Sequence, residues 1–297
     1  MTDYESVGRG FESPTAHQVS TFISEVDTFY LRRFSELARI YPLFSSSKGN
    51  CTYIGSRDEG ILIDCGVSYT RIKNALALNG IDISTAVKAV FITHEHHDHV
   101  CGLKTLTKKC SVPVFAQSYT LDVLLSENML SGYSEDIKEI IEIGDIIVKC
   151  FPTSHDTKES CGYRIELPDG KICAVCTDLG YVSDIVEENL TGCGAVLIES
   201  NYDEEMLRSC GYPEYLKARI RSRRGHLSNT DCAALCARLI GKGTTHFILG
   251  HLSQDSNTPE RALEVNRSFI SGQGFESPAD YLMTAAPVET GGGFISF

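Results

Sequence analysis

The sequence predicts an α/β (α+β) protein in which sheets are covered by helices. From residue 39 onward, short β-rich runs alternate with amphipathic segments, and many of the β-rich runs come in hairpin-like pairs. The helical segments are interspersed singly, which favours covered sheets over a purely parallel wind. No repeat, low-complexity tract or linker interrupts this region. We therefore expect one domain over residues 38–297.

The expected strands are short runs rich in apolar and β-branched residues, and the expected helices have apolar residues at helical spacing. The strands are expected at Arg39–Phe44, Cys51–Ile54, Gly60–Asp64, Val87–Thr93, Val112–Ala116, Glu139–Glu142, Ile146–Phe151, Gly162–Glu166, Lys171–Thr177, Ala195–Glu199, Thr245–Gly250 and Gly293–Phe297. The helices are expected at Tyr69–Leu78, Tyr119–Ser126, Tyr181–Glu188, Pro213–Arg221, Asn229–Ile240 and Pro259–Ser271.

Residues 1–37 are polar, lack sustained periodicity and are interpreted as an N-terminal extension. One hypothesis is a disordered or helical arm. The other is a start assigned too far upstream, because Gly8–His17 resembles the translated end of a tRNA gene. No methionine lies between Met1 and Met129, so such a start would use another codon. Both interpretations stay open.

Composition and net charge indicate where the protein acts and which partners it can have. Hydrophobic residues make up 42% of the chain, and no apolar run approaches the roughly 18 residues of a membrane span. We therefore expect a cytoplasmic protein with no membrane partner. The net charge is −12, so a nucleic-acid partner would need a local basic patch. The 12 cysteines, including Cys173 and Cys176, are expected to be reduced core residues.

A dense cluster of ionisable residues follows the apolar run Val87–Ile92. His94–His99 holds four histidines and two carboxylates, side chains that suit Zn²⁺ or Mn²⁺. On a loop leaving a strand, His94 and His96 can point to one side while Asp98 and His99 enter the next turn. One segment can then serve two metal ions. A solvated charged loop is a poor explanation for so dense a cluster.

This segment, His-x-His-x-Asp-His, resembles the signature of the metallo-β-lactamase fold superfamily. The superfamily's other motifs match, in chain order, Leu62–Gly66, Thr153–His155, Cys176–Asp178 and Leu249–His251. Together they span nearly all of residues 38–297. The resemblance implies a four-layer αββα sandwich and two bound divalent ions, Zn²⁺ or Mn²⁺.

The resemblance also implies how the ions are held. The first would be bound by His94, His96 and His155. The second would be bound by Asp98, His99 and His251, with Asp178 shared between the two. Asp64 would support the ligands without binding metal. Each of these residues outside His94–His99 has an ordinary structural alternative when taken alone.

The implied reaction is hydrolysis, because paired cations lower the pKa of a water between them and polarise the substrate oxygen. The candidate catalytic residues are Asp98, Asp178 and His226. Asp178 would bridge the ions. His226 would protonate the leaving oxygen of a phosphodiester, although by itself it could equally be structural. An aspartate rather than a cysteine at the bridging position suits phosphodiesters, but thioesterases of this superfamily share it.

Two segments are candidates for binding substrate phosphates. Lys217, Arg221 and Arg224 fall on roughly one face of the helix expected at Pro213–Arg221 and the residues after it. They could follow a phosphate backbone or simply be solvated cations at a helix end. The loop after Phe44 could present backbone N–H groups and polar side chains to a phosphate, or be a plain hairpin turn. Its candidate residues are Ser46, Ser47, Lys48 and Asn50.

Three local sequences resemble the WalJ (YycJ) exonuclease family: Phe44–Asn50, Glu199–Asp203 and Gly225–Asn229. The resemblance implies 5′→3′ exonuclease action on DNA. The chain departs from that family in its long leader and in Tyr202, where a histidine is expected. The alternatives are a small-molecule hydrolase acting on a thioester, lactone or cyclic phosphodiester, a ribonuclease, or an adaptor with a structural metal site. We make no prediction of oligomeric state.

Overall fold

The computed structural model describes residues 39–293 and 295–297. The expected N-terminal extension lies outside the described residues, so both hypotheses about residues 1–37 remain predictions. All elements below belong to the unit Ala38–Phe297.

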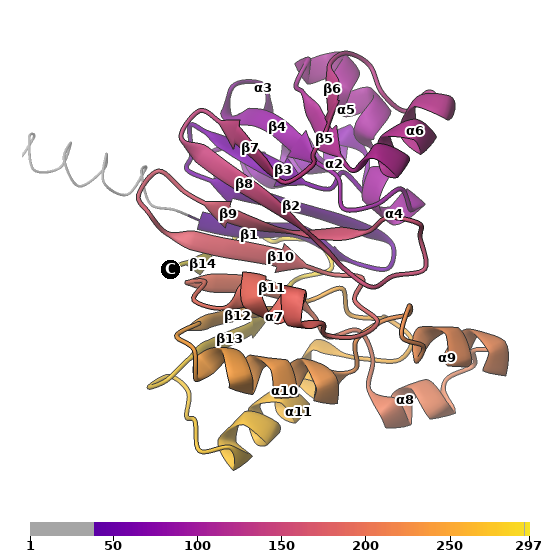
Figure 1. The fold of residues 1–297 in the computed structure, drawn as a ribbon, viewed down its shortest axis with the longest axis vertical. Helices are drawn as coiled ribbons and strands as arrows, with labels where there is room; N and C mark the ends of the chain where they lie inside the picture. The colour runs from indigo at the N-terminus through magenta and orange to yellow at the C-terminus, as the bar shows by residue number, and fades with distance from the viewer. Residues whose placement is uncertain (1–38, 294) are drawn as a thin grey trace, which may run out of the picture. The chain divides into compact units, whose positions relative to one another are not determined.

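Two seven-stranded mixed sheets form the centre of the molecule (Figure 1). The first has the order β14-β1-β2-β3-β4-β5-β6. Its strands are β1 (Arg39–Ser46), β2 (Gly49–Gly55), β3 (Gly60–Ile63), β4 (Val87–Phe91), β5 (Val114–Ala116), β6 (Ser134–Asp136) and β14 (Ile295–Ser296). The second has the order β13-β12-β11-β10-β9-β8-β7. Its strands are β7 (Ile140–Ile143), β8 (Ile146–Pro152), β9 (Cys161–Glu166), β10 (Ile172–Cys176), β11 (Ala195–Glu199), β12 (His246–Gly250) and β13 (Leu282–Ala285).

Helices cover the outer face of each sheet. On the first sheet lie α2 (Tyr69–Ala77), α3 (Ile83–Ala86), α5 (Leu103–Cys110) and α6 (Ser118–Ser126), with α4 (His97–Val100) at its end. On the second sheet lie α7 (Asp184–Leu190), α10 (Asn229–Ile240) and α11 (Pro259–Gly272). The short helices α8 (Glu204–Ser209) and α9 (Glu214–Ile220) lie together at one end of the sandwich (Figure 1).

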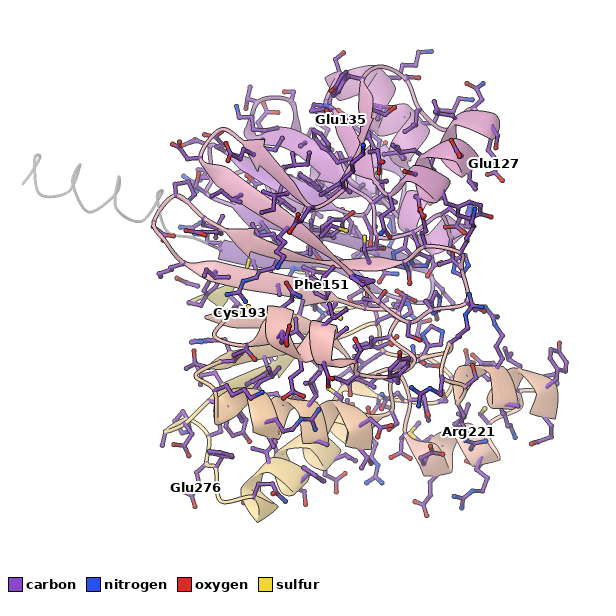
Figure 2. The ribbon with its side chains drawn as sticks, in the orientation of Figure 1. Glu127, Glu135, Phe151, Cys193, Arg221 and Glu276 are labelled. Atoms are coloured by element: carbon purple, nitrogen blue, oxygen red, sulfur yellow. The ribbon has the colours of Figure 1, made fainter. Side chains whose placement is uncertain are left out.

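Three hydrophobic layers hold the sandwich together. Between the sheets, Phe91 packs against Phe115 and Tyr163, with ring centroids 5.0 and 5.5 Å apart. The other two layers lie between each sheet and its helices. Phe151 and Cys193, labelled in Figure 2, belong to the layer beneath the second sheet. The predicted four-layer αββα sandwich is therefore confirmed.

Cys173 and Cys176 are buried on opposite faces of β10, as expected for core residues. Among the described residues, none of the helices combines the length and apolar character that a membrane span requires.

Most expected elements are present, and the differences have local causes. The helix expected from Tyr181 begins at Asp184 because the Ser183 hydroxyl accepts a hydrogen bond from the Val186 N–H. The sequence did not predict β6, β13, α3, α4, α5 or α8. Most of these are too short for periodicity to be read. In β13, only Met283 is buried, so its sequence lacks the apolar pattern of a core strand.

The topology brings several strand ends to one place. β10, β11 and β12 are parallel neighbours, and β3 and β4 are parallel neighbours in the other sheet. Residues that directly follow these strands therefore meet at one edge of the sandwich. This edge carries the candidate site.

Candidate metal centre

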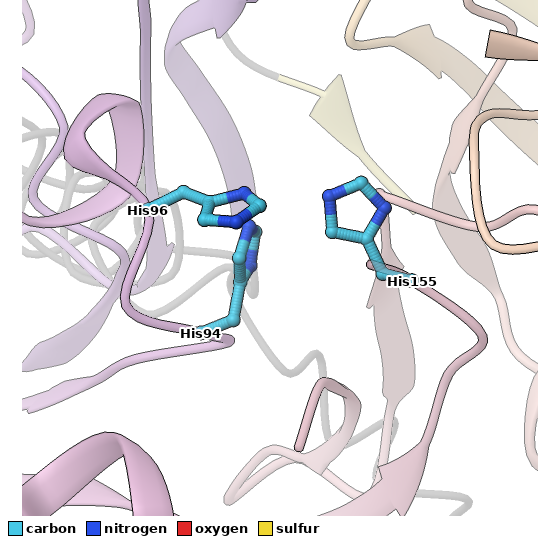
Figure 3. A group of neighbouring side chains, drawn as sticks. All are labelled: His94, His96 and His155. Carbon is cyan, nitrogen blue, oxygen red and sulfur yellow. The ribbon is translucent and has the colours of Figure 1, made fainter. Parts of the chain in front are cut away.

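The predicted ligands converge at this edge from both sheets. His94 and His96 follow β4, and His155 follows β8 of the second sheet. In Figure 3, the rings of His94 and His96 extend from one loop and that of His155 extends toward them from the opposite side. One ligand nitrogen from each lies within 4.8 Å of the other two. The three histidines expected to share an ion are thus brought together.

The second expected set also meets. Ligand atoms of Asp98, His99 and His251 lie within 4.8 Å of one another. The Asp178 carboxylate lies between the sets. Its Oδ2 is 3.2 Å from Nε2 of His99, and its Oδ1 is 3.6 Å from Nε2 of His155. This position suits a carboxylate shared by two ions.

Hydrogen bonds fix the orientation of the histidine rings. Nδ1 of His99 lies 2.7 Å from Asp64 Oδ2, and Nδ1 of His155 lies 3.1 Å from the Gly225 carbonyl oxygen. In each ring Nε2 is left facing the centre. Holding one nitrogen on a carboxylate or carbonyl is how proteins aim the other at a metal. Asp64 therefore occupies the supporting position that the sequence predicts.

Two buried atoms test whether the residues present fit a cation. Nε2 of His94 and Nε2 of His251 are buried, and neither has a hydrogen-bond partner among the described residues. Leaving buried polar atoms unpaired is costly. Imidazole nitrogens together with carboxylate oxygens are the donor set that Zn²⁺ and Mn²⁺ prefer. The residues fit divalent metal ions.

Burial and neighbouring charges shift the pKa values of the site residues. Burial lowers the pKa of His94 well below its ordinary value. Burial also opposes a charge on His99, but the Asp64 and Asp178 carboxylates raise its pKa well above the ordinary value. The pKa of Asp178 is well below its usual range despite burial, because His251 and His99 stabilise the carboxylate. The centre therefore holds buried negative charge that a cation would balance.

Three site residues adopt a backbone conformation that is unusual for them. Asp64, Asp178 and His251 have φ values of 61°, 55° and 52°, in the left-handed region. Side chains other than glycine reach this region at a cost, which is often retained at functional sites. Each residue comes just after a strand of the parallel groups, at the edge where the strand ends meet.

The sequence analysis missed Glu199 as a site residue. Its carboxylate is fully buried at the end of β11, between the strands that precede Asp178 and His251. Oε1 lies 2.7 Å from Nδ1 of His251 and 2.9 Å from Nδ1 of His226. Oε2 accepts hydrogen bonds from the backbone N–H groups of Leu179 and Leu227. Although burial opposes its charge, His226 and His251 lower the pKa of Glu199 to about 2.

A signal for Glu199 was present in the sequence. A carboxylate that ends the apolar run Ala195–Ile198 is unlike the residues before it and comes soon after Asp178 in chain order. Its partners, however, come from three separate segments. The sequence alone does not show that these segments meet.

His226 lies beside the expected metal positions. Its Nδ1 is hydrogen-bonded to Glu199 Oε1 and lies 3.8 Å from Asp178 Oδ1. Its side chain is 19% exposed. The ring can therefore contact solvent or substrate while Glu199 fixes its orientation. This placement is compatible with the proton-donor role expected for His226.

The loop after Phe44 is a tight hairpin turn between β1 and β2. The Ser46 N–H donates to Asn50 Oδ1, and the Lys48 N–H donates to Ser46 Oγ. Asn50 is buried, and its Nδ2 donates to Asp98 Oδ2 at 3.3 Å. Asn50 therefore positions a candidate ligand. Ser47 and Lys48 are exposed at the turn.

The expectation that Lys217, Arg221 and Arg224 form one exposed helical face is wrong. Lys217 is buried, and its Nζ donates to the Arg208 carbonyl of α8. Arg221, labelled in Figure 2, is bonded to Glu204. Arg224 lies beyond the end of α9, and its guanidinium donates to the carbonyl oxygens of His155 and Thr157. Arg224 therefore supports the loop that carries His155, while Lys217 and Arg221 connect α9 and its end to α8.

Comparisons with known proteins agree with the geometry. The β-lactamase superfamily domain matches residues 59–251. Exodeoxyribonuclease YycJ of Bacillus anthracis is 36% identical over 239 residues, which cover 78% of this chain and 89% of that protein. Exodeoxyribonuclease WalJ of Streptococcus pneumoniae (strain ATCC BAA-255 / R6) is 35% identical over 238 residues, covering 77% and 87%. The chain belongs to the YycJ/WalJ family of the β-lactamase superfamily. Like its family, it is a hydrolase with a candidate His/Asp metal centre.

Solved structures share the fold of this YycJ/WalJ-family chain at low identity. Zn²⁺-bound PqqB from Methylobacterium extorquens superposes with a TM-score of 0.63 at 16% identity, covering 87% of this chain and all (100%) of that one. YhfI from Bacillus subtilis gives a TM-score of 0.62 at 12% identity, covering 86% and 98%. These likenesses concern the fold alone.

Proposed function

We propose that this chain is a metal-dependent phosphodiesterase that acts on DNA as a 5′→3′ exonuclease in the cytoplasm. The observation that carries the proposal is the convergence of seven ligand side chains in a chain of the YycJ/WalJ family. The alignments with its relatives named exodeoxyribonuclease cover 89% and 87% of those proteins.

The residues that would hold the two cations are the sets described above, with Asp178 between them. Bound Zn²⁺ or Mn²⁺ would lower the pKa of a water to near neutrality and polarise the phosphoryl oxygen. Asp98 and Asp178 would place negative charge beside the bound cations, and the Asn50 amide donates a hydrogen bond that positions Asp98.

The leaving oxygen also needs a proton, and His226 would supply it. With Nδ1 bonded to Glu199, its Nε2 is available to give a proton to the leaving oxygen of the cleaved phosphodiester. The Glu199 carboxylate fixes which nitrogen of the ring faces the substrate. The pair therefore resembles the base–orienter arrangement of other hydrolases.

The test is a purified protein assayed with end-labelled DNA duplexes under Zn²⁺ and Mn²⁺. We expect stepwise release of nucleotides from the 5′ end, and metal analysis is expected to find two ions per chain. RNA of the same sequence, a thioester and nitrocefin are assayed in parallel. Faster turnover of any of these than of DNA would contradict the proposal.

Asp178→Asn provides the matched control for contamination. Asparagine tolerates the left-handed backbone that Asp178 adopts, so this variant removes charge without adding strain. We expect DNA cleavage to fall by at least about a hundredfold. Cleavage that survives at the wild-type rate would come from another enzyme.

A further inference from the structure

A small chamber adjoins the metal centre at the α8–α9 end of the sandwich. Its volume is about 170 Å³. Pockets that enclose a whole small-molecule ligand are larger, roughly 300–1,000 Å³. The chamber can therefore hold one group of a substrate that extends beyond it. Its polar lining residues are Ser47, Asn201, Tyr212, Arg219, His226 and Ser253.

The walls of the chamber are tied to the metal centre. His226 is bonded to Glu199, and Asn201 Nδ2 donates to the His251 carbonyl oxygen at 2.7 Å. The Gly225 carbonyl bonds to His155. A group bound in the chamber would therefore lie next to the bond that the centre cleaves.

The chamber differs from the metal centre in charge. The described residues that line it include a guanidinium and hydroxyl groups but no carboxylate; the carboxylates nearest to its lining are Asp156, bonded to Arg219, and Asp255, bonded to the Tyr212 hydroxyl. The metal centre beside it is crowded with carboxylates, among them Asp98, Asp178 and Glu199. The guanidinium in its lining therefore favours an anionic group of the substrate in the chamber.

Arg219 is placed to recognise such an anion. Its Nε and Nη2 both contact the same oxygen of Asp156, Oδ2. The guanidinium fork thus keeps further N–H donors for a second acceptor. The Arg219 side chain is 55% exposed, and ion pairs of this kind contribute little to stability. The contact with Asp156 therefore serves to hold the guanidinium at the chamber rather than to stabilise the fold.

We propose that the chamber binds a phosphate of the substrate other than the one being cleaved, and that Arg219, held by Asp156, recognises it. The inference rests on the proposed function, because it requires a substrate with more than one phosphate. Arg219 was not among the phosphate residues expected from the sequence. We assign to Arg219 the substrate-phosphate contact that the sequence led us to expect of Lys217, Arg221 and Arg224.

The binding test uses a fluorescent duplex blocked at both ends by phosphorothioate linkages, with affinity measured by anisotropy over a range of salt concentrations. For Arg219→Ala we expect roughly tenfold weaker binding at low salt and a log–log salt slope smaller by about 1, the change for one lost phosphate contact. Arg219→Lys keeps the charge but loses the fork, so it should fall between. Arg238→Ala is the matched control, since Arg238 is also an exposed arginine bonded to a carboxylate, Glu187, on another face.

A kinetic test separates this chamber from the chemistry. Bis(p-nitrophenyl) phosphate carries only the phosphate that is cleaved. We expect Arg219→Ala to raise KM for DNA roughly tenfold and to affect this small substrate several-fold less. Duplexes with a 5′-phosphate or a 5′-hydroxyl identify the source of the bound phosphate: a loss confined to the former assigns a terminal phosphate, and an equal loss assigns a backbone phosphate.

Two results would overturn the inference while leaving the proposed function intact. One is an Arg219→Ala enzyme with the wild-type salt slope and KM for DNA. The other is an equal loss on both substrates, with lowered metal content. It would mean that Arg219 acts on the metal centre through Asp156, whose Oδ1 lies 3.2 Å from Nε2 of His155. A wild-type enzyme that neither binds nor cleaves DNA would overturn the proposed function, and this inference with it.

Discussion

Asp64 Oδ2 lies 2.7 Å from Nδ1 of His99, with both side chains buried. Asp64 also accepts hydrogen bonds from the backbone N–H and the hydroxyl of Thr93, the residue before the histidine cluster. One carboxylate thus fixes both the ring of a ligand and the start of the loop that carries the others.

Asp64→Asn is expected to weaken metal binding by about 10- to 100-fold, the usual effect of removing such a supporting carboxylate. Asparagine accepts the positive φ of Asp64, so the backbone need not change. Competition with a chromogenic chelator measures the affinity. Unchanged metal affinity would mean that the His99 ring keeps its orientation without this carboxylate.

Glu199 makes the stability of the metal-free protein depend on pH. Its pKa is lowered from 4.5 to about 2, so the charged carboxylate stabilises the fold above about pH 4.5 and this contribution is lost as the pH falls toward 2. Glu199→Gln should therefore be less stable at pH 7, by on the order of 3 kcal/mol, with a gap that narrows below pH 4.5. Thermal unfolding in a chelator at pH 7, 5, 4 and 3 measures it. A gap of the same size at pH 3 and pH 7 would contradict the prediction.

Gly66 lies against the backbone of Asp98 in α4 and of Asn50 in β2. A Cβ at this position would lie 1.7 Å from the Asp98 carbonyl oxygen and 2.6 Å from the Asn50 nitrogen. Gly66→Ala must displace the segment that carries Asp98, and we expect a loss of roughly 1–3 kcal/mol in stability together with weaker metal binding. Gly211→Ala is the control, because no heavy atom lies within 4 Å of its added Cβ. Equal melting temperatures for the two variants would count against this account.

Arg224 is expected to act on the metal loop rather than on DNA. Its guanidinium donates to the carbonyl oxygens of His155, at 3.0 Å, and of Thr157. Arg224→Ala should lower metal affinity by up to roughly tenfold and leave the salt dependence of DNA binding unchanged. Chelator competition and anisotropy measure the two effects. A smaller salt slope with unaltered metal affinity would restore Arg224 as a phosphate contact.

The sequence predicted the residues that share a short segment or a recognisable motif. His94, His96, Asp98 and His99 are close in the chain, so their shared chemistry is visible before folding. Glu199 and Arg219 were missed because their partners come from distant segments.

Lys217 shows a different reason for error. Helical spacing placed it on an outer face, but α8, which the sequence did not predict, packs over it and buries it. A helical wheel describes one helix and carries no information about its neighbours. The shortest elements were missed for the related reason that a single turn has no measurable period.

Each ligand set draws on both sheets: His94, His96, Asp98 and His99 come from the first half of the chain, while His155 and His251 follow strands of the second sheet. A cation held by either set is thus a cross-link between the two halves of the sandwich. Loss of the ions should then loosen the packing of Phe91 against Tyr163 between the sheets, at a distance from the metal centre. The metal bonds that would prepare the reaction would then also join one sheet to the other.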